Sequence, residues 1–107
     1  MVIRISEIEI EPEYLEEYLS IIKEESRASV ALESGVISIY PMYQKESPTE
    51  IRILEIYADK KAYEAHLETP HFKHYKTVTL KMVKSLKLVD MNSIDGEAIP
   101  MIFKKIR

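Results

Sequence analysis

The chain has 107 residues, of which 46% are hydrophobic and 31% are charged, and its formal net charge is −3. This length and balance predict one folded domain over residues 1–107 and argue against disorder. The lack of cysteine excludes disulfides, thiolate nucleophiles and cysteine-bound metals, and the negative net charge disfavours nucleic-acid binding.

No apolar run approaches the roughly 20 residues that a membrane-spanning helix requires. The first residues, Met1–Glu7, have the pattern of a strand and not the basic-then-apolar pattern of a signal peptide. We therefore expect a cytoplasmic protein that does not bind membranes.

The first third of the chain predicts a strand followed by a long helix. Val2–Ile10 is rich in β-branched residues, and Pro12 suits the first turn of the helix that follows. Tyr14–Leu32 has apolar residues at helical spacing, and its charged residues, Glu25 among them, are assigned to the solvent side. Gly35 is expected to end the helix in the left-handed cap conformation.

Two strands joined by a polar hairpin are predicted next, over Val36–Gln44 and Glu50–Tyr57. Pro41 lies inside the first of these strands and cannot donate a ladder hydrogen bond. This strand should therefore lie at a sheet edge or carry a bulge.

Two short helices and a fourth strand complete the domain. Asp59 is a candidate N-cap for a helix over Lys60–Leu67, and Thr69 caps a second helix with Pro70 at its first position. The fourth strand is predicted over Ser85–Met91.

The order strand-helix-strand, twice over, predicts an α+β ferredoxin-like sandwich, in which both main helices cover one face of a four-stranded antiparallel sheet. The strands are apolar on both faces, and a large apolar sheet face is unfavourable in water. We therefore expect a homodimer formed face to face, with the apolar tail from about residue 92 wrapping the partner.

Histidines provide the first candidate for chemistry. His66 lies on the helix after the third strand and could act as a general base, or it could be a locally hydrogen-bonded helical residue. His71 and His74 have metal-compatible spacing, with His66 as a third ligand. No His-Glu-x-x-His motif accompanies them, so we expect no metal.

Glu55 is a second candidate because it interrupts an apolar strand face. A buried carboxylate must be paired or neutralised, and either Arg4 or Arg52 is the expected partner. The alternative is a catalytic or substrate-orienting role.

Aromatic side chains could form the walls of a cavity for a flat apolar molecule, although core packing explains them equally well. The chain has no glycine-rich phosphate loop, flavin fingerprint or hydrolase elbow. An enzyme built on this chain would work without a cofactor.

Several motifs together resemble the antibiotic biosynthesis monooxygenase (ABM) family, over about Val2–Asp90. They are Glu33–Val36, Glu55–Tyr57 with Asp59, Ala62–Leu67 and Thr69–Phe72. The resemblance implies a ferredoxin-like fold, a dimer joined through the sheets as an α/β barrel, and a pocket between sheet and helices. Family members include cofactor-independent enzymes that oxidise quinols or anthrones with dioxygen, others that degrade haem, and a group that processes a signalling sugar derivative.

The resemblance implies a monooxygenase for a quinol-like aromatic molecule, with His66 as catalytic residue and no cofactor. The expected substrate-binding residues are Tyr40, Arg52, Glu55, Tyr57, Phe72 and Tyr75. Many members carry tryptophan at the position of Tyr57, so haem degradation is disfavoured. Two alternatives stay open: a small-molecule binding or stress-response module, and an isomerase for a small signalling metabolite.

Overall fold

The structure is a computed structural model that describes residues 1–106. Its elements are β1 (Val2–Ile10), the 3-10 turn η1 (Pro12–Tyr14), α1 (Leu15–Leu32), β2 (Val36–Gln44), β3 (Ser47–Tyr57), α2 (Lys60–Leu67), α3 (Pro70–Thr79), β4 (Val83–Met91) and α4 (Ala98–Lys104).

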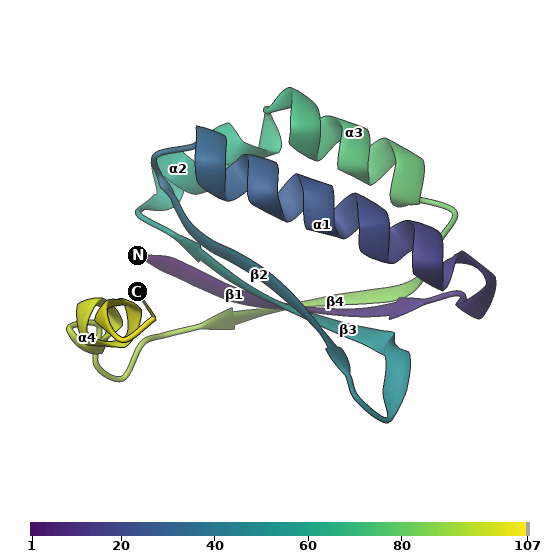
Figure 1. Cartoon of the computed structure of the whole chain (residues 1–107). Coiled ribbons are helices and arrows are strands. Elements are labelled where there is room, and N and C mark those ends of the chain that lie inside the picture. Colours follow the sequence, from purple (N-terminus) through teal and green to yellow (C-terminus); the bar gives the residue numbers. More distant parts are fainter. Residues whose placement is uncertain (107) are drawn as a thin grey trace.

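The four strands form one antiparallel sheet in the order β2-β3-β1-β4, and α1, α2 and α3 lie together on one face of it (Figure 1). This arrangement confirms the predicted α+β ferredoxin-like fold. The strand that contains Pro41 is at the sheet edge, as predicted, where a residue without an N–H is tolerated.

Two side-chain caps set the positions of α2 and α3, as the sequence predicted. The Asp59 carboxylate accepts a hydrogen bond from the Ala62 N–H at 2.8 Å, and the Thr69 hydroxyl accepts one from the Phe72 N–H at 3.3 Å. Pro70 occupies the first turn of α3. The short break between the two helices places His66 and Phe72 over the same part of the sheet, with their ring centroids 4.8 Å apart.

The core lies between α1 and the helix-facing side of the sheet. Strand register places Ile8 of β1 opposite Ile51 of β3 on this side, and both are buried. Tyr18 and Ile22 of α1 pack against them as part of the same cluster. This packing fixes α1 over the centre of the sheet.

Gly35 differs from the prediction, because no glycine in the described chain has a positive φ. Its small size is needed for another reason. A Cβ atom built on Gly35 would lie 2.4 Å from the Cβ of Ala62, so the loop after α1 contacts α2 too closely for any side chain. Glycine is required here by close approach and not by a left-handed conformation.

Two strand boundaries and one additional helix also differ from the prediction. β3 begins at Ser47 because this residue pairs with Gln44, which leaves only two residues in the hairpin turn. β4 begins at Val83, which pairs with Ile10. The tail contains the helix α4, which was not predicted and lies apart from the helices that cover the sheet (Figure 1).

The sheet face opposite the three helices carries exposed apolar residues. Tyr40, Met42 and Met91 are 62%, 40% and 48% exposed. The homodimer that would cover this face stays a prediction.

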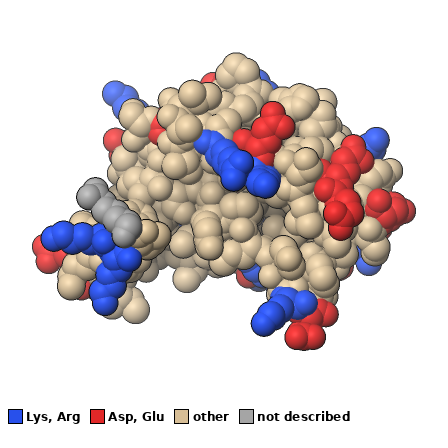
Figure 2. Space-filling view, viewed as in Figure 1, with Lys and Arg blue, Asp and Glu red and all other residues tan. Residues whose placement is uncertain are grey.

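Basic and acidic side chains are interspersed over the face of the molecule in Figure 2. Among the described residues, no helix combines the length and apolar character that a membrane crossing requires.

We predict that Gly35→Ala lowers the free energy of unfolding by about 1–3 kcal/mol, because the added methyl group would overlap the backbone-proximal Cβ of Ala62. Denaturant unfolding measures the change. Gly96→Ala is the matched control, since its new Cβ would meet its nearest neighbour at an ordinary 3.6 Å. Equal stability of the two variants would contradict the close-approach interpretation.

Candidate functional site

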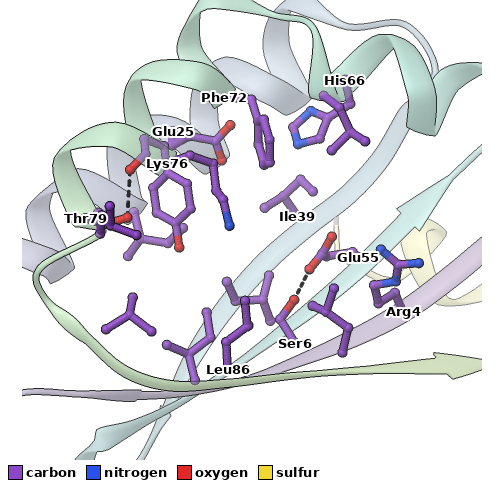
Figure 3. Close-up of a pocket in the computed structure, with 18 of the residues that line it drawn as sticks. Arg4, Ser6, Glu25, Ile39, Glu55, His66, Phe72, Lys76, Thr79 and Leu86 are labelled. Carbon is purple, nitrogen blue, oxygen red and sulfur yellow. Dashed lines mark hydrogen bonds between the residues drawn. The ribbon is translucent and has the colours of Figure 1, made fainter.

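A cavity of about 380 Å³ lies between the sheet and the helices α1, α2 and α3 (Figure 3). Phe72 and His66 lie on its helical side, and Ser6 and Glu55 rise from the sheet opposite them. Most of the wall is apolar. Leu86 and other lining residues of β4 are about half exposed, so the cavity opens beside this strand.

His66 is a buried polar group of the cavity, with 3% of its surface exposed. It extends from the last turn of α2 and lies against the rings of Phe72 and Tyr57, with centroid distances of 4.8 and 5.5 Å. Its Nδ1 atom lies 3.0 Å from Oε2 of Glu33, the residue that ends α1. The ring is therefore held by two aromatic contacts and by a hydrogen bond to Glu33.

The same Glu33 oxygen lies 2.6 Å from Nε2 of His71, at the start of α3. An ionised carboxylate can only accept hydrogen bonds, so both of these nitrogens donate. This assigns the tautomers from the hydrogen-bond network: His66 keeps a lone pair on Nε2, and His71 keeps one on Nδ1. A single carboxylate thus orients two imidazoles.

Among residues 1–106, Glu55 forms no ion pair with an arginine, so the predicted pairing with Arg4 or Arg52 is wrong. Its carboxylate accepts hydrogen bonds from the hydroxyl groups of Ser6 and Tyr57, the latter at 2.7 Å. Arg4 instead donates to Tyr63 at 2.7 Å and to Asp90 at 3.0 Å. These neutral donors solvate the Glu55 carboxylate without cancelling its charge.

Arg52 pairs elsewhere because it points away from the helices. Its guanidinium lies 3.6 Å from the Glu50 carboxylate. Residues alternate between the two faces of a strand, so Arg52 and Glu55 are on opposite sides of the sheet.

The buried tyrosines around the cavity are neutral phenols. Burial raises the pKa of Tyr57 well above its usual value, and the adjacent Glu55 carboxylate raises it further. Burial likewise raises the pKa of Tyr75 to about 12, and its hydroxyl lies 2.7 Å from that of the equally buried Tyr18. Tyr57 and Tyr75 therefore act as hydrogen-bonding groups and not as bases at physiological pH.

The structure brings most of the predicted site residues together. The cavity is lined by His66, Glu55, Tyr57, Phe72 and Tyr75. Tyr40 and Arg52 are not among its lining residues. Tyr40 is paired with Leu54, on the sheet face away from the cavity helices, and borders a separate apolar groove between α1 and β2.

Residues 1–78 match the family model ABM, which is described as antibiotic biosynthesis monooxygenase. A solved structure of a proposed antibiotic biosynthesis monooxygenase from Bacteroides thetaiotaomicron is 49% identical, with a TM-score of 0.86 over 88% of this chain and 90% of that one. This chain belongs to the antibiotic biosynthesis monooxygenase family.

Two further structures place the chain more broadly within the ABM fold. A proposed monooxygenase from Lactobacillus acidophilus is 31% identical, with a TM-score of 0.83 over 85% of this chain and 43% of that longer one. A protein from Nitrosomonas europaea is 19% identical over 89% of this chain and all of its own, with a TM-score of 0.84, which shows the shared fold alone. No match was found among curated proteins.

Two carboxylates of the candidate site were missed by the sequence analysis. Glu25 was assigned to the solvent side of α1, but it is 6% exposed and lines the cavity. Its spacing from Tyr18, Ile22 and Ser29 follows the helical repeat, and all four residues are buried. That spacing was the available signal. Glu33 was noted only within the Glu33–Val36 motif, because no local pattern shows which residues approach it.

We predict that stability falls as pH rises from about 10 toward 12. Tyrosine ionises near pH 10 in the unfolded chain, whereas burial keeps Tyr18, Tyr57 and Tyr75 protonated in the fold. Their contribution is complete below pH 10 and is lost above it. Unfolding free energies at pH 9 and 11, with tyrosinate absorbance, measure the effect. Reversible ionisation of all seven tyrosines in a fully folded chain would contradict it.

Proposed function

We propose that this ABM-family protein is a monooxygenase that oxidises a quinol or related phenolic molecule with dioxygen, and that the reacting centre uses no flavin and no metal. The observation that carries the proposal is the enclosed His66, which lines a mostly apolar cavity and whose Nδ1 is engaged by Glu33. A histidine oriented by a carboxylate is the arrangement of a general base.

The proposed first step is removal of a phenolic proton by Nε2 of His66. The Glu33 carboxylate stabilises the imidazolium that forms, 3.0 Å from Nδ1. The wall of the cavity is mostly apolar, so the resulting anion is less well solvated than in water and is electron-rich.

This anion supplies the electrons for dioxygen, so no external reductant is needed. In an anthrone-type substrate, one oxygen atom bonds to the ring methylene carbon and remains as a carbonyl. The other oxygen leaves as water with the two hydrogens of that carbon.

The cavity walls suit a flat aromatic molecule. Phe72 and Tyr75 from α3 face Ile39 and Ile53 on the sheet, and the space between them is about 380 Å³. That volume lies in the range of small-molecule sites. The Glu55 carboxylate would accept a hydrogen bond from a substrate hydroxyl at the sheet side.

We predict that His66→Ala reduces oxygen uptake with a hydroquinone panel by about 100-fold or more, since it removes the proton acceptor. An oxygen electrode measures the rate in buffer treated with a chelator. His74→Ala, which changes an exposed histidine on α3, is the matched control and should retain the wild-type rate.

Equal rates for wild type and His66→Ala would remove His66 from the mechanism. Tight binding of a phenol without any oxygen uptake would instead support the small-molecule binding module.

An isomerase is the second candidate, because Arg4 and Lys76 also line the cavity. A cationic group near the carboxylates Glu25 and Glu55 would suit acid–base chemistry on a phosphorylated or hydroxylated metabolite. Binding of sugar phosphates in preference to phenols would favour this reading over the oxygenase.

A further inference from the structure

We propose that Glu25, His66 and His71 form a binding site for a divalent transition-metal ion of the zinc class, where α1, α2 and α3 meet. Sequence spacing had suggested His71 and His74 as a pair. The fold instead leaves His74 exposed and brings His71 toward residues from two other helices.

The first argument is distance. One potential ligand atom from each of the three residues lies within 4.8 Å of the other two. Zinc holds nitrogen and oxygen ligands at about 2.0–2.2 Å, which requires ligand atoms about 3.4 Å apart on a tetrahedral ion. Side-chain movements that shorten these separations by up to about 1.4 Å would bring the three ligand atoms to this spacing.

The second argument is the chemistry of the ligands. Two imidazoles and one carboxylate suit zinc and its neighbours in the first transition row. Three protein ligands leave a fourth position open for water or a ligand in the cavity. Glu25 and His66 are buried, at 6% and 3% exposure, so an ion here would be shielded from bulk water.

The third argument is the support around these ligands. Glu33 accepts hydrogen bonds from Nδ1 of His66 and Nε2 of His71, which leaves the other nitrogen of each ring able to donate a lone pair to a metal. Carboxylates that hold ligand histidines in this way are the usual surroundings of protein metal sites. The Ser29 hydroxyl lies 2.7 Å from Oε1 of Glu25 and limits its rotation.

One consequence rests on the proposed function. The Nε2 lone pair of His66 cannot both bind a metal ion and accept a proton from a phenol. Occupancy of the site by zinc would therefore inhibit the oxygenase reaction, and a chelator would restore it.

The test is equilibrium dialysis of chelator-stripped protein against Zn²⁺. We expect about one tightly bound ion per chain in wild type, and an affinity weakened about tenfold or more in Glu25→Gln and in His71→Ala. His74→Ala is the control and should bind as wild type does. Zn²⁺ should also raise the melting temperature of wild type, since it joins three helices.

The Glu25→Gln variant changes a buried group, so circular dichroism must show that it folds. His71 has a side chain 20% exposed and gives a second variant that does not depend on the first. The proposed site would be overturned by an absence of bound zinc, by wild-type zinc affinity in both Glu25→Gln and His71→Ala, or by loss of binding only in His74→Ala.

Oxygen uptake separates this proposal from the proposed function. If the protein binds zinc as expected but oxidises no phenol, the metal site is supported and the proposed oxygenase function is overturned. If the protein is an active oxygenase and binds zinc as expected, but zinc does not inhibit it, the inference that metal binding and proton transfer compete for Nε2 of His66 is overturned.

Discussion

The carboxylate of Glu33 is the constraint on which the rest of the site depends. It lies at the C-terminal end of α1, where the helix dipole disfavours negative charge. Hydrogen bonds from His66 and His71, at 3.0 and 2.6 Å, offset that cost. They also connect the end of α1 to α2 and α3. The residue that fixes the three helices at this corner thus also selects the tautomer of the candidate base.

Hydrogen-bonded polar groups line the cavity on both the sheet side and the helix side. Ser6, Glu55 and Tyr57 form one hydrogen-bonded group on the sheet, and Glu25 with Ser29 forms another on α1. Buried carboxylates need hydrogen-bond partners and do not pack densely against apolar side chains. The space between the groups is the space a ligand would use, and it opens beside β4, where Leu86 and Leu88 are about half exposed.

Local rules predicted the fold well, whereas the site needed knowledge of tertiary contacts. Caps at Asp59 and Thr69, and proline at a sheet edge, depend only on neighbouring residues, and they were confirmed. Tyr40 and Arg52 were assigned to the cavity by residue type, yet strand alternation places them on the other sheet face. Glu33 meets histidines 33 and 38 positions later, and no spacing rule reaches that far.

The most direct test is the tautomer of the two histidines, read from long-range ¹H–¹⁵N correlations in protein labelled at histidine nitrogen. When both imidazoles are neutral, the account predicts that His66 is protonated on Nδ1 and His71 on Nε2. In Glu33→Ala, the ¹⁵N signals of these two tautomers should disappear. His66 protonated on Nε2, or spectra unchanged in that variant, would contradict the role of Glu33 and the orientation of the proposed base.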